Sequence, residues 1–429
     1  MKTAIFWFRR DLRLDDNVGL FQAMNSGLRV LPIFVFDSEI LDELPKNDAR
    51  VDFIFKEISY LKKSLEEMGS SLLILKGKPI EQIPAIVKKY NVAKIFVNSD
   101  YEPYAIERDS KIGKFCNENG IDFLTHKDQV VFEKDEILSK SGNPYTVFTP
   151  YSKSWKEKLK TISIEAKEID KLSGNFIKTR PFPNTTLEQL GFSPSAIEFL
   201  NKEIDLDKIR NYHINRDLPS VAGTSRLSVH LRFGTVSIRK LVKIALENNE
   251  KWLNELIWRE FYMQILWHFP NIVKNSFRKK YDRMVWRNNS AEFEAWKNGK
   301  TGYPIVDAGM REMNETGFMH NRLRMITASF LTKHLLIDWR WGEAYFAEKL
   351  LDYELSSNNG GWQWAAGTGC DAVPYFRIFN PSLQQKRFDP NLLYIKKWIP
   401  EIDTDTYPKP IVNHELARKR TLEAYKKIQ

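Results

Sequence analysis

The chain has 429 residues, of which 42% are hydrophobic and 28% are charged, and its formal net charge is +10. This length exceeds the size at which one core normally stops growing, so we expect two folded domains. Two cysteines exclude a disulfide framework and a cysteine metal site, and the charged residues that soon follow Lys2 exclude a signal peptide. We therefore expect a cytoplasmic protein with no membrane span and no metal ion.

The first part of the chain alternates short apolar runs with longer amphipathic stretches. The amphipathic stretches cover residues 51–69 and 79–90, and the apolar runs cover residues 3–8, 29–36, 71–77, 93–99 and 122–126. This alternation predicts a doubly wound parallel α/β domain, similar to a Rossmann fold, over residues 1–130. The turn after the first run reads FRRDLRLDDN (8–17) and lacks GxGxxG, so we expect no ordinary dinucleotide site there.

The composition and hydrophobic pattern of the chain change after residue 130 and again after residue 196. Residues 131–196 are rich in Pro, Ser, Thr, Asn and Lys, which predicts a long linker with a helical stretch. From residue 197 to 429 helical patterns dominate, so we expect an all-α second domain. Residues 197–429 carry 36 Lys+Arg against 27 Asp+Glu, whereas residues 1–196 carry 29 against 28. This imbalance indicates that the second domain meets a polyanion.

Tryptophans are concentrated in the helical part. Ten of the 12 lie between Trp252 and Trp398, and several stand beside Asn, Asp or Arg. Indoles in such surroundings are suited to stack on bases or on a flat cofactor. The run GTSRLS (223–228) offers hydroxyls and a flexible glycine, which could cradle a pyrophosphate or simply cap a helix.

Several motifs resemble those of the photolyase and cryptochrome family. They are FWFRRDLRLDDN at the start, GTSRLS (223–228), LNELIWREFY (253–262), KTGYPIVDAGMR (300–311), MHNRLRMITASFLTKHLLIDWRWG (319–342) and NNGGWQWAAGTGCDAVPYFRIFNP (358–381). The chain is most similar to class I photolyases that act on cyclobutane pyrimidine dimers. The resemblance covers nearly the whole chain, and it implies an α/β antenna domain followed by a helical domain that binds FAD.

The resemblance also implies roles for residues around the flavin. Arg324 and Asp352 would form an ion pair beside the flavin ring, and Asn358 would face flavin N5, where plant cryptochromes carry an aspartate. Glu354 stands where the family has a second aspartate, and its extra methylene group shifts the reach of the carboxylate toward the flavin. The implied FAD contacts are Tyr212, Thr224, Ser225, Arg226, Leu227, Ser228, Trp252, Asn321, Arg324, Asp352, Glu354 and Asn358.

A buried flavin requires the damaged bases to leave the duplex and to stack on aromatic side chains. Helical spacing places Glu255 with Trp258, and Asn321 with Met325, on shared faces. The resemblance implies a lesion-binding set of Arg216, Glu255, Trp258, Arg259, Asn321, Arg322, Met325, Trp364 and Arg377. A further basic group could contact flanking phosphates or could be an ordinary solvated face: Lys274, Arg278, Lys279, Lys280 and Arg283.

Three tryptophans, Trp286, Trp339 and Trp362, resemble the family's relay that carries electrons to the flavin, whereas Trp296 and Trp341 are expected to be packing residues. Together these features predict a light-driven lyase that splits cyclobutane pyrimidine dimers in UV-damaged DNA and acts as a monomer. Two alternatives remain: a blue-light receptor of the cryptochrome type, and a repair enzyme for the (6-4) photoproduct. The latter would need a histidine where this chain has Met325.

The antenna pigment is open. Photolyases that carry a folate have an Asn and a Glu shortly after a strand end, whereas this chain has Tyr104 and Ala105 at that place. The usual polar contacts to a pterin are therefore missing. We expect that folate is not the antenna, and that Tyr104 either stacks on another pigment or closes the cleft by packing.

Overall fold

The computed structural model describes residues 2–428, which form two compact units. The first unit contains residues up to 136 together with 157–203 and 227–247, and the second contains 137–156, 204–226 and the residues from 248 onward. Each unit is therefore assembled from separate stretches of the chain. The domain ranges expected from the sequence, 1–130, 131–196 and 197–429, stay a prediction.

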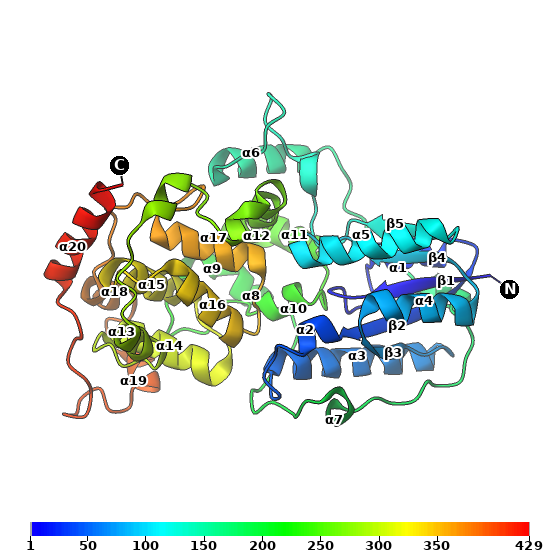
Figure 1. Ribbon diagram of the computed structural model, residues 1–429, viewed down its shortest axis with the longest axis horizontal. Coiled ribbons are helices and arrows are strands. Elements are labelled where there is room, and N and C mark those ends of the chain that lie inside the picture. The colour runs from blue at the N-terminus through cyan, green and yellow to red at the C-terminus, as the bar shows by residue number, and fades with distance from the viewer. Residues whose placement is uncertain (1, 429) are drawn as a thin grey trace. The chain divides into compact units, whose positions relative to one another are not determined.

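Within the described chain, the first unit is built on a five-stranded parallel sheet with the order β3-β2-β1-β4-β5 (Figure 1). Its strands are β1 (Thr3–Phe8), β2 (Arg29–Asp37), β3 (Leu73–Gly77), β4 (Val92–Asn98) and β5 (Asp122–His126). Its helices include α1 (Val18–Met24), α2 (Ser38–Leu41), α3 (Ala49–Glu67), α4 (Pro79–Tyr90) and α5 (Pro103–Glu118). Ile5 and Trp7 of β1 join the core that also holds Ile83 of α4 and Ile112 of α5. This arrangement confirms the predicted α/β class.

The run FRRDLRLDDN, which follows β1, forms ion pairs rather than a phosphate-binding turn. Arg13 and Arg239 both bind the buried Asp128 carboxylate, each at 2.8 Å. Gly234 has a φ of 63°, and a Cβ at this position would lie 2.2 Å from the backbone oxygen of Arg10. Only glycine therefore permits this approach. These contacts explain why residues 227–247 belong to the same unit as the sheet.

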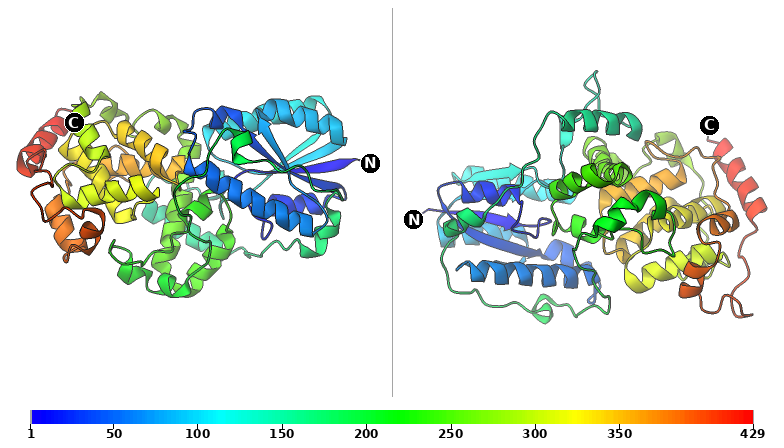
Figure 2. Two further views of the ribbon diagram at one scale, coloured as in Figure 1. Left: turned by 90° about the horizontal axis from the view of Figure 1, so that it is seen from below. Right: turned by 180° about the vertical axis from the view of Figure 1, so that it is seen from behind.

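The stretches that follow β5 contain helices and no strand within the described residues, as predicted. They are η1 (Lys134–Glu136), α6 (Phe148–Leu159), η2 (Asp170–Asn175), α7 (Leu187–Leu190), α8 (Leu206–Arg210), α9 (Tyr212–Asn215), α10 (Ser228–Arg232), α11 (Ile238–Asn248), α12 (Glu250–His268), η3 (Pro270–Val273), η4 (Lys279–Arg283), α13 (Ser290–Lys297), α14 (Pro304–Thr316), α15 (Asn321–Ser329), the π-helix η5 (Phe330–His334), α16 (Trp339–Lys349), α17 (Leu355–Ala366), α18 (Pro381–Phe388), α19 (Leu393–Trp398) and α20 (His414–Lys426). Two views of these helices are given in Figure 2. None of the helices in residues 2–428 has the length and apolar character needed to cross a bilayer.

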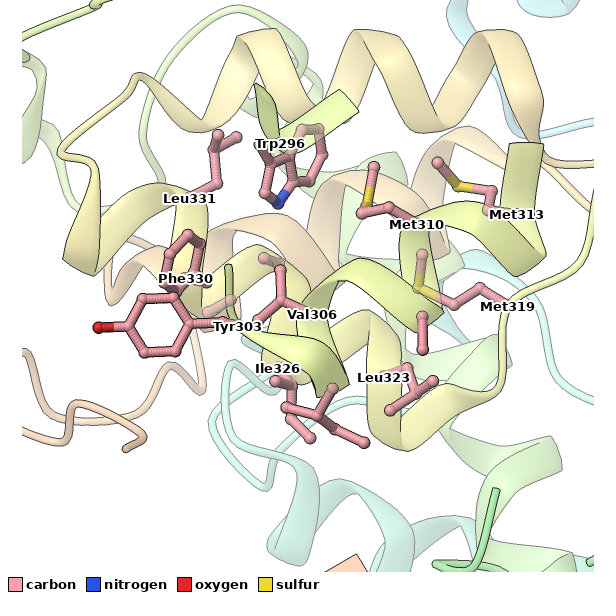
Figure 3. Close-up of a cluster of buried hydrophobic side chains, with 14 of the residues drawn as sticks. Trp296, Tyr303, Val306, Met310, Met313, Met319, Leu323, Ile326, Phe330 and Leu331 are labelled. Carbon is pink, nitrogen blue, oxygen red and sulfur yellow. The ribbon is translucent and has the colours of Figure 1, made fainter. Parts of the chain in front are cut away.

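The core of the second unit is centred on α14 and α15, and Figure 3 shows Trp296, Met310 and Phe330 within it. Helix α14 begins with Pro304, whose missing N–H costs nothing at a helix start. A Cβ on Gly309 of α14 would lie 3.2 Å from the side chain of Leu323 of α15. The small residue therefore lets the two helices pack closely, and this core supports the helices that carry the predicted site.

Candidate functional site

Helix α12 carries the predicted acid and indole, Glu255 and Trp258, and both side chains are partly buried in the second unit. The Arg216 Nη1 donates to Glu255 Oε1 at 2.6 Å, and the Arg216 guanidinium lies 5.2 Å from the centre of the Tyr212 ring. Burial raises the pKa of Glu255, and the positive charge of Arg216 opposes this shift. The structure therefore brings three of the predicted site residues together around one carboxylate.

Trp258 stacks on Phe148, a residue that the sequence analysis did not assign to the site. Their ring centres are 3.7 Å apart and the ring planes differ by 4°. Phe148 lies at the start of α6, within residues 131–196, for which the sequence predicts a linker with a helical stretch. Its backbone N–H donates to the Asp371 carboxylate at 3.1 Å, which fixes the start of α6 against the loop after α17. Only this long-range contact identifies Phe148, since nothing in its local pattern does.

Tyr262 connects the two indoles predicted to flank the lesion. Its ring centre lies 5.5 Å from that of Trp258, and with Trp364 it lines a cavity of about 10 Å³ beside Cys370. A Cβ on Gly360 of α17 would lie 2.2 Å from the Tyr262 ring, so α17 can approach α12 only because it has glycine there. The aromatic side chains of α12 and α17 thus belong to one surface.

Arg324 and Asp352, which the sequence predicts to lie beside the flavin, form an ion pair. Arg324 Nη2 of α15 donates to Asp352 Oδ2 at 2.8 Å, and Arg324 Nε donates to the backbone oxygen of Met319 at 2.9 Å. The Asp352 side chain is only 8% exposed, against 27% for Arg324. A largely buried pair whose geometry is fixed by a backbone carbonyl can hold a charged ring in place.

Glu354 is buried and not a helix-surface acid, since its exposed fraction is 5%. Arg259 Nη2 donates to Glu354 Oε1 at 3.3 Å, and the Ser357 hydroxyl donates to Oε2 at 3.0 Å. Asn358 lies one residue further along α17 and donates its amide hydrogens to Glu343 of α16. The acid and the amide are therefore held by other side chains of the same unit.

The predicted relay tryptophans differ in environment. Trp362 and Trp339 are buried, and their indole nitrogens have no hydrogen-bond partner within the described residues, whereas Trp286 is partly buried. Trp362 makes a ring contact with Trp296, at 6.0 Å between centres. Trp296 donates its indole N–H to the backbone oxygen of Thr327 at 3.1 Å, as expected for a packing residue. Trp341 is 37% exposed and contacts the Phe293 ring.

The run GTSRLS passes from the second unit into the first between Arg226 and Leu227. Arg226 has a φ of 52°, and its guanidinium lies 4.5 Å from the centre of the Phe318 ring. Helix α10 begins at Ser228, and no side chain caps it. Thr224, Ser225 and Ser228 are partly buried and Leu227 is buried, as is Trp252 of α12.

Several buried polar atoms near the predicted FAD contacts lack a hydrogen-bond partner within residues 2–428. They include Asn254 Oδ1, next to Glu255, and His320 Nε2, next to Asn321. An unpaired buried polar atom costs free energy unless a ligand or water satisfies it. These atoms, with the ion pair of Arg324 and Asp352, fit a polar cofactor such as FAD.

The basic side chains predicted to contact DNA are mostly exposed. Arg377 is exposed, as are Lys274, Arg278, Lys279, Lys280 and Arg283. Arg322 is partly buried, pairs with Asp217 at 2.6 Å and lies 4.4 Å from the centre of the Phe388 ring. Gln363 Nε2 of α17 donates to the backbone oxygen of Ile272 at 3.1 Å, which ties the start of the basic run to α17.

Comparisons with known proteins agree with this geometry. The sequence profile of the FAD binding domain of DNA photolyase matches residues 252–405, and that of DNA photolyase matches residues 4–171. A deoxyribodipyrimidine photo-lyase of Synechococcus sp. is 37% identical, with 99% of this chain and 96% of the relative covered. An archaeal photolyase from Sulfolobus tokodaii, solved with two FAD molecules, has a TM-score of 0.84 and 35% identity, covering 99% of this chain and 100% of that chain. A cryptochrome from Synechocystis sp. also has a TM-score of 0.84, at 26% identity, covering 100% of this chain and 99% of that chain.

A parallel α/β unit combined with a helical FAD-binding domain defines a class of flavoproteins. The chain belongs to the photolyase and cryptochrome family. The resemblance found in the sequence is thereby confirmed, and so is the prediction of FAD as cofactor.

Proposed function

We propose that this chain splits cyclobutane pyrimidine dimers in DNA, with light and reduced FAD as the source of the electron. The observation that carries the proposal is the surface on which Trp258, Tyr262 and Trp364 adjoin the ion pair of Glu255 and Arg216. Enzymes that act on a base take it out of the stack, hold it against aromatic faces and bind its edge with polar groups. Glu255 supplies the polar group, and Arg259, Asn321, Arg322 and Met325 complete the pocket.

FAD, when bound, supplies the light-excited electron. The protein's part is to bind and orient the cofactor and to tune its charge. Arg324 favours a negative charge on the ring, Asp352 accepts a hydrogen bond, and Asn358 provides a neutral amide at N5. The proposed remaining contacts are Tyr212, Trp252, Glu354 and the run Thr224, Ser225, Arg226, Leu227 and Ser228.

The electron relay is a further part of the proposal. Trp362, Trp339 and Trp286 would carry an electron from the surface to the flavin, since indole is among the few side chains that can be oxidised reversibly. The burial of Trp362 and Trp339 and the partial exposure of Trp286 support this order.

Repair of a defined lesion tests the function. A duplex that carries one thymine dimer should lose the dimer under illumination when the flavin is reduced, and should keep it in the dark. Trp258→Ala should lower the preference for damaged over undamaged DNA, whereas Trp341→Ala, which removes an exposed indole, should not. Light-driven flavin chemistry without loss of the dimer would favour a receptor of the cryptochrome type. Repair of a duplex that carries a (6-4) photoproduct, in place of the dimer, would favour a (6-4) repair enzyme.

Asn358→Asp separates the repair enzyme from the receptor. A carboxylate near N5 would repel a negatively charged reduced flavin, so repair should drop while dimer binding is kept. The measurement is the reduction potential of the bound flavin together with dimer affinity. An unchanged potential would show that Asn358 does not face N5.

We also propose a monomer in the cytoplasm whose exposed arginines, including Arg377, contact DNA phosphates. The free thiols of Cys116 and Cys370 fit a reducing compartment. Sedimentation of the purified protein tests the monomer, and a dimer mass would contradict it.

A further inference from the structure

The amide group of Asn358 is fixed in one orientation by a single residue. Its Nδ2 donates to the backbone oxygen of Glu343 at 3.0 Å and to Glu343 Oε1 at 2.9 Å. An amide nitrogen has two N–H groups, and both are used on these acceptors. A backbone carbonyl can only accept, so the assignment of nitrogen and oxygen in this amide is determined. Asn358 Oδ1 is left as the group that can face a ligand.

The contact lies beside a close approach of α16 and α17. A Cβ on Gly342, the residue before Glu343, would lie 2.1 Å from the Trp362 ring. Asn358 and Trp362 are four residues apart on α17 and therefore share one face of that helix. Both helices are labelled in Figure 1. This close approach places the Glu343 side chain against the amide of Asn358. It also places the Trp362 ring against the backbone of α16 at Gly342.

The carboxylate of Glu343 has no polar partner other than Asn358 within residues 2–428. It forms no ion pair there, and Asn358 is the only side chain that hydrogen-bonds to it. Burial raises the pKa of Glu343, and the hydrogen bond from Asn358 opposes this shift. Neither solubility nor the neutralisation of a nearby charge explains why a partly buried carboxylate stands here, since its one side-chain hydrogen bond is to the Asn358 amide.

We propose that Glu343 is a positioning residue that sets which end of the Asn358 amide faces flavin N5. The inference rests on the proposed function, because that function places Asn358 at N5. Reduced flavin carries a hydrogen on N5 and oxidised flavin does not. Oδ1 can accept from that hydrogen, whereas an amide turned by 180° would present N–H against N–H. Glu343 thus favours reduced flavin without touching it.

The test compares Glu343→Leu with Glu343→Gln in the FAD-loaded protein. Leucine keeps the backbone carbonyl of residue 343 but removes the carboxylate acceptor, so one hydrogen bond holds the amide instead of two. The equilibrium for one-electron reduction should then fall about tenfold, the effect of about one hydrogen bond. This is about 59 mV in the midpoint potential. Glutamine keeps an acceptor oxygen and should retain the potential. Glu348→Leu is the matched control, since it removes an acid of α16 whose side chain is 50% exposed.

A double mutant distinguishes positioning from a direct effect of charge. In an Asn358→Ala background, Glu343→Leu should leave the potential unchanged. An equal shift in both backgrounds, or no shift in the single variant, would overturn the proposal. If Glu343→Leu does not fold, Glu343→Asp decides: it keeps the charge but is too short, so its potential should also fall, and an unchanged potential overturns the proposal. Failure of wild-type protein to bind FAD or repair dimers would instead contradict the proposed function.

Discussion

His320 is a buried residue whose protonation state follows from its hydrogen bond. It is the N-cap of α15, and its Nδ1 accepts from the backbone N–H of Arg322 at 3.1 Å. A nitrogen that accepts carries no proton, so the ring is neutral. Burial lowers the pKa of His320 to about 4, with the nearby positive charge of Arg322 and Arg324 adding to the shift.

This shift predicts a loss of stability in acid. His320 has its depressed pKa only in the folded protein, so the unfolded chain takes up the proton first as pH falls. The contribution of neutral His320 to the free energy of unfolding is therefore fully present above about pH 6.5. It decreases by about 3 kcal/mol as the pH falls toward 4. In His320→Asn, which keeps a capping acceptor, denaturant unfolding between pH 7.5 and 4 should show a loss smaller by that amount. Equal losses in the two proteins would mean that other groups titrate.

Phe148 supports the indole that is proposed to flank the lesion. Phe148→Ala should reduce the ratio of affinities for damaged and undamaged DNA by about three- to tenfold, because a stacked aromatic pair contributes about 0.5–1.5 kcal/mol beyond burial. Phe148→Tyr should retain the ratio. Filter binding with both duplexes measures it. A ratio that rises in Phe148→Ala would indicate that Phe148 occupies the place of the flipped base.

At the scale of elements, α16 and α17 carry two of the three proposed relay residues, Trp339 and Trp362, whereas Trp286 lies between η4 and α13. Trp362→Phe should leave FAD bound but stop its photoreduction by external donors, because phenylalanine is much harder to oxidise than indole. Photoreduction is followed by the flavin absorption bands. Repair by protein whose flavin has been reduced chemically should survive.

Two controls fix the route of the electron. Trp341→Phe alters an exposed indole of α16 and should have no effect. Trp296→Phe tests the ring contact of Trp296 with Trp362, and it should also photoreduce normally if Trp296 only packs. Normal photoreduction in Trp362→Phe would show that the relay is assigned to the wrong residue.

The end of β2 and the start of α5 hold the residues that bear on the antenna pigment in the first unit. The Tyr104 hydroxyl donates to the Asp37 carboxylate and lies 3.2 Å from Glu39 Oε2. The Arg108 guanidinium lies 5.9 Å from the centre of the Tyr104 ring and 5.0 Å from that of the Trp7 ring. Tyr104 is therefore engaged by its neighbours, which supports the packing interpretation over stacking on a free pigment.

From these contacts we expect the isolated protein to contain no tightly bound methenyl-folate. Its repair action spectrum should follow reduced flavin alone unless a deazaflavin or a second flavin is supplied. An absorption spectrum of native protein and extraction of its pigments measure this. Stoichiometric folate would contradict the prediction and would mean that the cleft binds pterin through other residues.

At the scale of the whole molecule, the net charge of +10 predicts how DNA binding depends on salt. Affinity for a damaged duplex should fall by orders of magnitude from low to moderate salt. The reason is that the release of counterions from DNA favours binding less as the salt concentration rises. Arg377→Ala should weaken the binding of damaged and undamaged DNA to the same extent. It should also reduce by about 1 the slope of log affinity against log salt concentration. Lys114→Ala, at a lysine of the first unit that is 79% exposed, is the control. A flat salt response would remove the electrostatic argument.

The features that could be predicted from the sequence are those that depend on local residue spacing or on short motifs. The five apolar runs became the strands of the parallel sheet, and the helical spacing of Glu255 and Trp258 is that of α12. Phe148 and Glu343 were missed, because each acts on a residue 110 or 15 positions away along the chain. No periodicity in a single segment records such a contact.

By itself, the sequence determined the class of each element, the family and the identity of the side chains that motifs point to, because hydrophobic periodicity and short motifs are local properties. Only the tertiary structure decided which side chains meet. It assigned residues 227–247 to the unit that contains the sheet, placed Phe148 on Trp258, and turned the Asn358 amide toward Glu343. These outcomes depend on close packing between distant segments, which glycines such as Gly234, Gly342 and Gly360 permit.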